Sequence, residues 1–151
     1  MITIEDFKKK QTNRSRLIGI DLGSKLIGIA ICDENQKVAT PFKTIKKSTM
    51  KNLIDELKMI IEENNVKGII IGNPLNMDGS FGKSAQSAND MSINLSKKIN
   101  VPISLWDERL STVGAFNLSS LLDIKVAKRK KNIDQNAAAF ILQGALDFFN
   151  N

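Results

Sequence analysis

Residues 17–32 carry the sequence LIGIDLGSKLIGIAIC, which decides the fold of this chain. Two apolar runs, 17–22 and 26–32, flank a short turn that contains Gly23 and Ser24. Apolar runs of this length, bounded by turn residues, are typical of β-strands. We therefore expect a hairpin of two strands. Asp21 is the one charged residue within either run, and it lies close to the end of the first predicted strand.

The chain beyond this hairpin predicts three more strands. Residues 38–45 form a plausible third strand, and the short links between the first three favour an antiparallel meander. Near-continuous apolar runs at 66–71 and 101–106 predict strands that are buried on both faces, with Trp106 as a core or strand-end aromatic. A polar loop is expected over 72–82.

Apolar residues at helical spacing predict helices between and after these strands. The first covers 50–61, with Ser48 as its candidate N-cap, and the second follows Ala85 to Leu95. Further helices are expected over 110–122 and over 133–148. The last of these would begin with Asn132 as N-cap and Gln135 at the third helical position. Strands followed by helix–strand alternation predict an α/β fold, with one mixed sheet and helices on both faces.

The length of 151 residues fits one domain. We expect residues 1–15 to form a polar arm or frayed helix and residues 16–150 a single domain. The N-terminus lacks the apolar segment of a secretory signal, and no stretch is long and apolar enough for a membrane span. Cys32 is the single cysteine, so we expect a buried structural thiol, no internal disulfide and a cytoplasmic location.

Charge and composition limit the partners and the catalytic residues that this chain can use. The net charge of +6 suits a polyanionic partner such as nucleic acid. The chain has no histidine and no tyrosine, which excludes Ser-His and Cys-His nucleophile systems and every histidine metal site. An enzyme of this composition would have to rely mainly on carboxylates and lysines.

Carboxylates fall at the ends of the predicted core strands. Asp21 ends the first strand, Asp107 and Glu108 follow the fifth, and Asp134 lies in the first turn of the last helix. Ligand sites of such sheets form outside the carboxyl ends of the parallel strands, so we expect these acids to meet. Carboxylate clusters suit Mg²⁺ or Mn²⁺, and a pair of such ions can promote phosphodiester hydrolysis.

Each acid also has a simpler interpretation. Asp21 could make a turn beside its glycines, and Asp134 could offset the dipole of its helix. The sequence Asp107-Glu108-Arg109 could be an ion pair at a strand end. Strand alternation places Asp107 and Glu108 on opposite faces, and the sequence leaves open which of them points into the site.

Two groups of basic residues are apparent. Five positive charges between residues 125 and 131 lie just before Asp134, and they could contact a phosphate backbone or form a solvated basic loop. They are Lys125, Lys128, Arg129, Lys130 and Lys131. A weaker group is treated as a solvated face, and it comprises Lys43, Lys46, Lys47 and Lys51.

Four segments, in this order and spacing, resemble the bacterial YqgF (RuvX) family. They are IGIDLGSK at 18–25, GNPLNMDGS at 72–80, DERLST at 107–112 and IDQNAA at 133–138. The resemblance runs from about residue 15 to 149. It implies a ribonuclease H-like fold, with a five-stranded mixed sheet in the order 3-2-1-4-5 and helices on both faces.

The resemblance also implies a metal-dependent nuclease of two-metal-ion type that processes the 5′ end of precursor small-subunit ribosomal RNA. Some relatives are linked instead to Holliday-junction resolution. The implied catalytic acids are Asp21, Glu108 and Asp134, with Asp107 as a further metal ligand for Mg²⁺ or Mn²⁺. The expected substrate contacts are Lys25, Asn73, Asn76, Arg109, Lys128, Arg129, Lys130 and Lys131.

Three positions depart from the family pattern. The family usually has arginine where Leu26 stands, an acid where Phe81 stands, and often glutamate at Gly114. These departures affect substrate contacts more than metal binding. Expected partners are nucleic acid and ribosomal particles, with no membrane, and the chain is expected to be a monomer or a homodimer.

Two other functions fit parts of the sequence. The segment at 19–24 also resembles the phosphate loop of actin-like ATPases and sugar kinases, but those proteins use two lobes and this chain has the length of one. A non-catalytic nucleic-acid-binding factor in ribosome assembly would keep the fold without cleavage, and the three departures permit it.

Overall fold

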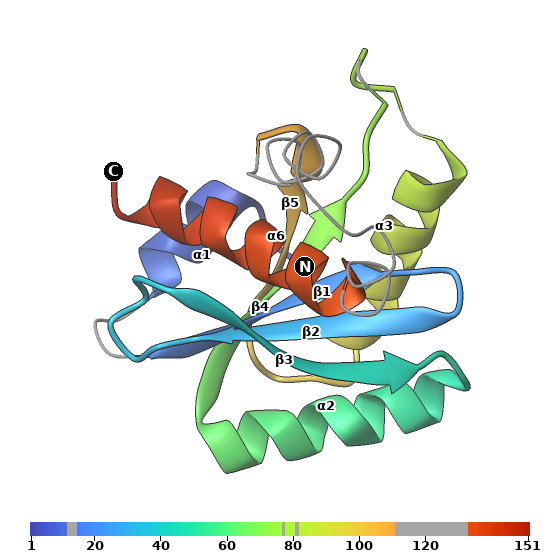
Figure 1. Ribbon diagram of the computed structural model, residues 1–151, viewed down its shortest axis with the longest axis horizontal. Helices are drawn as coiled ribbons and strands as arrows, with labels where there is room; N and C mark the ends of the chain where they lie inside the picture. The colour runs from blue at the N-terminus through green and yellow to red at the C-terminus, as the bar shows by residue number, and fades with distance from the viewer. Residues whose placement is uncertain (12–14, 77, 81, 111–132) are drawn as a thin grey trace.

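The computed structural model describes residues 1–11, 15–76, 78–80, 82–110 and 133–151; for Leu110 and residues 133–135 it describes the backbone alone (Figure 1). A five-stranded sheet in the order β3-β2-β1-β4-β5 forms its centre. The strands are β1 (Arg16–Leu22), β2 (Leu26–Cys32), β3 (Ala39–Lys46), β4 (Val66–Asn73) and β5 (Ile103–Asp107). The strand order expected from the sequence is confirmed.

Strand directions divide the sheet into two parts. The first three strands form an antiparallel meander, in which β1 pairs with β2 and β2 with β3. Beyond β1, the strands β4 and β5 are parallel to it and to each other. The carboxyl ends of β1, β4 and β5 therefore meet at one edge of the sheet, where ligand sites of α/β folds form.

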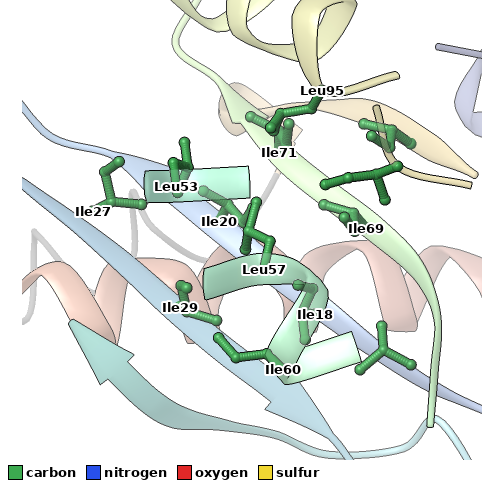
Figure 2. Close-up of a cluster of buried hydrophobic side chains, with 13 residues drawn as sticks. Ile18, Ile20, Ile27, Ile29, Leu53, Leu57, Ile60, Ile69, Ile71 and Leu95 are labelled. Carbon is green, nitrogen blue, oxygen red and sulfur yellow. The ribbon is translucent and has the colours of Figure 1, made fainter. Parts of the chain in front are cut away.

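Helices cover both faces of the sheet (Figure 1). On one face, α2 (Met50–Asn64) and α3 (Lys83–Ser96) pack over a cluster of buried isoleucines and leucines. Figure 2 shows this cluster, in which Ile18 and Ile20 of β1 meet Leu53 and Leu57 of α2. On the other face lie α1 (Ile4–Lys10) and α6 (Ile133–Phe149).

Helix α6 packs very closely on β1. A β-carbon added at Gly19 would lie 2.7 Å from Leu142 Cβ and 2.9 Å from the carbonyl oxygen of Ala138. The far end of the helix is fixed by Asn150, whose side chain donates a 2.8 Å hydrogen bond to the carbonyl of Gln36, in the β2–β3 connection. Gln36 in turn donates to the carbonyl of Ser15, just before β1, at 3.0 Å. Helix α6 thus runs antiparallel to β1 and begins near the carboxyl end of that strand.

The N-terminal residues were expected to form a polar arm or a frayed helix. Residues 4–10 form the helix α1, and Ile2 donates a backbone hydrogen bond to the carbonyl of Ile103 at 2.9 Å. Phe7 is fully buried, and its ring stacks on Phe149 with centroids 5.6 Å apart. Burial of this aromatic ring, together with the packing of Ile2 and Ile4 on the same cluster, attaches a largely polar segment to the fold.

Smaller differences concern the ends of elements. The N-cap of α2 is Thr49 rather than the expected Ser48, and its hydroxyl accepts from the backbone N–H of Asn52 at 3.2 Å. The helix ends at Asn65, which adopts the left-handed conformation with φ 53°. The helix expected over 110–122 and the N-cap at Asn132 lie outside the described residues, apart from Leu110 in the 3-10 turn η1 (Glu108–Leu110).

Two further expectations about single residues hold. Cys32 is buried, its Sγ accepts from the backbone N–H of Leu17 at 3.2 Å, and burial raises the pKa of the thiol to about 11, so it is a structural thiol. Trp106 is a core residue that packs against Phe148. None of the helices in the described ranges has the length and apolar character of a membrane span.

Candidate active site

The strand register places three positions side by side at the carboxyl edge of the sheet. Ile20 of β1 pairs with Ile71 of β4, so Asp21 lies level with Gly72. Gly72 pairs with Trp106 of β5, two residues before Glu108. Because Ile20 packs on the face of α2, strand alternation directs Asp21 to the opposite face, towards α6.

Glu108 lies over Gly72. A β-carbon added at Gly72 would be 3.2 Å from Glu108 Cδ and 2.5 Å from Ile141 Cδ1. The absence of a side chain at this position therefore makes room for the carboxyl group, between β4 and α6. The sequence predicted Gly72 at the end of the fourth strand, at the edge where the site was expected. It did not predict the contact with Glu108, which depends on how the turn after β5 folds over β4.

The electrostatics of Glu108 follow from this location. The pKa of its carboxyl is raised from 4.5 to about 7, first because burial disfavours the charged form, and then because the charges of Asp21 and Asp107 repel it. Two carboxyl groups that repel each other across a buried position form a site that is favourable for a cation.

Asp107 has a different partner. Its Oδ2 lies 2.7 Å from Nη2 of Arg109, and Nε of Arg109 lies 3.0 Å from its Oδ1. The backbone N–H of Arg109 also donates to Asp107 Oδ1 at 3.0 Å, which closes a turn around Glu108. These hydrogen bonds from Arg109 lower the pKa of Asp107. The ion pair considered for this segment is therefore confirmed for Asp107 and Arg109, while Glu108 faces Asp21.

A small cleft opens at the two carboxylates. Its volume is about 170 Å³. Its walls are formed by Asp21, Leu22, Gly72, Pro74, Ser84, Ala88 and Glu108. The cleft thus joins the ends of β1 and β4, the turn after β5 and the start of α3. The sequence placed Ala88 on the apolar face of a helix and gave Ser84 no role, and it predicted neither of them in the site, because nothing in their local pattern indicates that α3 reaches this edge.

Asp134 has its backbone in the first turn of α6, and its side chain lies outside the described part of the structure. One helical turn later, Ala138 approaches Gly19, two residues before Asp21. The backbone of Asp134 is therefore on the side of the helix that faces the end of β1. Within the described residues, no group of three or more Asp, Glu, Cys or His side chains could hold a metal ion.

The residues expected to contact substrate differ in their exposure and in their hydrogen-bond partners. Lys25 is exposed in the β1–β2 turn, and its carbonyl accepts from the backbone N–H of Lys47 at 2.9 Å. Asn76 donates to Ser80 Oγ at 3.0 Å within the loop after β4. Arg109 binds Asp107.

Asn73, at the end of β4, is buried, and its Oδ1 has no hydrogen-bond partner among the described residues. The basic residues Lys128, Arg129, Lys130 and Lys131 lie outside the described ranges, as do Phe81 and Gly114. Leu26 begins β2 and is 37% exposed, so the side chain that replaces the usual arginine is available to solvent.

Sequence comparisons relate almost the whole chain to known proteins. A family model described as "RuvX: Holliday junction resolvase" matches residues 15–148. A protein of Pelagibacter ubique named "Putative pre-16S rRNA nuclease" is 71% identical over 151 residues, which cover 100% of both chains. A protein of the same name from Nitrobacter hamburgensis is 45% identical over 134 residues, which cover 89% of this chain and 82% of that protein.

Solved structures share the fold at low sequence identity. RuvC of T. thermophilus, in complex with a Holliday junction substrate, matches with a TM-score of 0.54 and 13% identity, covering 87% of this chain and 93% of its own. The yeast mitochondrial Holliday junction resolvase Ydc2 matches with a TM-score of 0.50 and 16% identity, covering 97% and 84%. Together with the strand order, these matches establish the ribonuclease H-like fold expected from the sequence.

Proposed function

The chain belongs to the RuvX family, and from this premise we propose that it is a metal-dependent nuclease that hydrolyses phosphodiester bonds. The observation that carries the proposal is the pair of carboxylates, Asp21 and Glu108, that meet over Gly72 in a cleft at the edge of the sheet. Two neighbouring carboxylates in a cleft could hold a metal ion against the phosphodiester bond of a bound substrate.

The residues present fit a divalent cation. The pKa of Glu108 is raised first by burial and then by repulsion from Asp21 and Asp107, and a bound cation would stabilise the charged carboxylate against both effects. Carboxylate oxygens are the ligands that Mg²⁺ and Mn²⁺ prefer. We propose Asp21, Glu108 and Asp134 as the ligands, the last because the first turn of α6 begins near the end of β1.

A bound Mg²⁺ or Mn²⁺ ion, or a pair of them in a two-metal site, would activate a water molecule and stabilise the oxygen that leaves the phosphodiester. Other residues of the chain hold the proposed metal ligands in place. Asp107 and Arg109 fix the turn that directs Glu108 towards Asp21, so both act as positioning residues. In the metal-free protein Glu108 holds a proton near neutral pH, and a cation would displace it.

For the substrate we propose the precursor of small-subunit ribosomal RNA, because relatives that are 71% and 45% identical are named for this activity. A cytoplasmic location and contact with ribosomal particles are part of this proposal. A Holliday junction is the second candidate, because the family model that matches residues 15–148 is described as a Holliday junction resolvase.

The test is a cleavage assay on precursor ribosomal RNA and on a four-way DNA junction, each with Mg²⁺, with Mn²⁺ and with chelator. We expect metal-dependent cleavage of one substrate. Glu108→Gln and Asp21→Asn should lower the cleavage rate by about 10²–10⁴-fold. The matched control Glu62→Gln, on an exposed face of α2, should leave the rate unchanged.

Three outcomes are informative. Cleavage of one substrate alone assigns the substrate class. Cleavage that persists in chelator, or in both site variants, would contradict the proposal. Binding of RNA or junction by all variants, with no cleavage by any of them, would instead favour a non-catalytic assembly factor.

A further inference from the structure

A second hollow adjoins the carboxylate cleft, between the β1–β2 turn and α3. Its volume is about 290 Å³. Its walls are formed by Leu22, Gly23, Ser24, Lys47, Lys83, Ser84, Ser87 and Met91. Leu22 and Ser84 also form walls of the carboxylate cleft. The two hollows are therefore neighbours that share part of their walls, and we refer to the second one as the lysine groove.

The lysine groove has the chemistry of a phosphate site. Two lysines and three serines contribute to its walls, and no carboxylate does. Lys47 follows β3, and its backbone N–H donates to the carbonyl of Lys25 at 2.9 Å, which fixes this segment against the β1–β2 turn. Lys83 is the first residue of α3. The groove thus has one lysine from the segment after β3 and one from the start of α3.

Neither lysine is neutralised by a neighbour in the part of the chain that the structure describes. The salt bridges found there join Arg109 to Asp107, and Lys43 to Glu56 at 2.9 Å. Lys43 belongs to the same group of lysines as Lys47, and that group was expected to be a solvated face. The structure divides the group, because Lys43 pairs with α2 whereas Lys47 forms a wall of the groove.

The start of α3 adds to the positive potential. Its N-cap is Gly82, which has no side chain to accept a hydrogen bond from the first turn. The N-terminal end of a helix carries a partial positive charge, so this end favours an anion in the groove. Exposed serine hydroxyls at positions 84 and 87 are available as donors to phosphate oxygens.

We propose that the lysine groove binds the phosphodiester backbone of the nucleic-acid strand next to the bond that is cut, with Lys47 and Lys83 contacting its phosphates. This inference rests on the proposed nuclease function, and it adds to that function the path of the strand. A strand that occupies both hollows would leave the carboxylate cleft on the side of α3, between the β1–β2 turn and the helix.

The test measures how the affinity for a fluorescently labelled single-stranded RNA depends on salt. The parent is the Asp21→Asn chain, so that the RNA stays intact, and the variant adds Lys47→Gln and Lys83→Gln. Each phosphate contact on a single strand contributes about 0.7 to the slope of log affinity against log salt. We expect the slope to fall by about 1.4, so between 50 and 200 mM salt the parent should lose about sevenfold more affinity than the variant does.

The matched control adds Lys97→Gln and Lys98→Gln to the same parent. Both are exposed at the opposite end of α3, so the net charge falls by the same amount away from the groove. The control should keep the slope of the parent. An unchanged slope in the Lys47 and Lys83 variant, an equal decrease in the control, or a parent that binds no RNA would each overturn the inference.

The cleavage assay separates this inference from the proposed function. If the wild-type chain cleaves nucleic acid and the Lys47 and Lys83 variant keeps the parental slope, the groove proposal fails and the nuclease stands. If the wild-type chain cleaves neither substrate while the slope falls in this variant alone, the groove binds nucleic acid and the proposed nuclease function fails.

Discussion

Two adjacent acids, Asp107 and Glu108, have different environments and different proposed roles. Arg109 binds both carboxylate oxygens of Asp107, whereas Glu108 is turned towards Asp21 above Gly72. The sequence predicted that the two side chains would point in opposite directions, but it could not tell which pointed into the site. The contact that decides this, between Arg109 and Asp107, depends on the turn conformation after β5 rather than on the order of residues.

The raised pKa of Glu108 predicts that the stability of the metal-free protein depends on pH. Between its ordinary value of 4.5 and about 7, the folded chain holds a proton that the unfolded chain has lost. The free energy of unfolding should therefore fall as pH rises through this window, and the loss should be complete above pH 7. Because solvent screens part of this site, we expect a loss of about 1–2 kcal/mol.

Chemical denaturation in the presence of chelator, at a series of pH values, measures this effect. The Glu108→Gln variant provides the comparison, because it cannot titrate and should lack this component of the pH dependence. Saturating Mg²⁺ should also reduce the component, since the cation compensates the charge of the carboxylates. A wild-type chain with the same pH dependence as Glu108→Gln would argue against the close approach of Asp21 and Glu108.

Packing of α6 on the sheet determines the space at the site. Gly72 lies between Ile141 of this helix and Glu108, and a β-carbon there would lie 2.5 Å from Ile141 Cδ1. The same helix is in contact with Gly19 one strand away. The two glycines therefore allow α6 to pack closely on β1 and β4 near their carboxyl ends.

Gly72→Ala should lower the free energy of unfolding by about 1–3 kcal/mol, because the added methyl group overpacks the contact with Ile141. The cost should be smaller when Ile141→Val is present, since this change removes the methyl group that would lie 2.5 Å away. Denaturation of both single variants and the double variant measures the coupling. Additive effects would show that Ile141 does not limit the space at Gly72.

Phe7→Ala should lower the free energy of unfolding by about 3–5 kcal/mol, as expected for a fully buried phenylalanine. Its matched control is Phe42→Ala on the edge strand β3, where the side chain is 41% exposed and the expected cost is no more than about 1 kcal/mol. Thermal or chemical denaturation compares them. Equal effects of the two changes would mean that α1 is not part of the folded core.

The elements that could be predicted are those with a strong pattern of apolar residues. β2 begins and ends where the sequence predicted, and the helical spacing from Leu53 to Ile60 identified α2. For the seven-residue helix α1 the sequence left an arm and a frayed helix open, because few apolar residues, Phe7 with Ile2 and Ile4, attach this segment to the core. Caps were less certain, since Ser48 and Thr49 have similar capping chemistry and only the backbone geometry distinguishes them.

The topology of the whole sheet explains why part of the site could be predicted from the sequence. Parallel strands bring their carboxyl ends to one edge, so Asp21 and the acids after β5 could be assigned to a common site from the strand order alone. The strand order also placed Gly72 at this edge, but not its contact with Glu108. Ser84 and Lys83 could not be assigned in this way, because their roles arise from contacts between distant segments. The contribution of Lys47 likewise depends on how the chain after β3 lies beside α3.

The proposed metal site uses Asp21 and Glu108 as ligands, and we expect Asp107 to position Glu108 without binding the ion. Titration of the protein with Mn²⁺, followed by the loss of the electron paramagnetic resonance signal of free Mn²⁺, measures this binding. We expect Asp21→Asn and Glu108→Gln to weaken binding by more than about tenfold. Asp107→Asn should retain most of the affinity, because asparagine can still accept the backbone hydrogen bond of Arg109. Loss of Mn²⁺ binding in Asp107→Asn, with binding intact in Glu108→Gln, would mean that Asp107 and not Glu108 is the metal ligand.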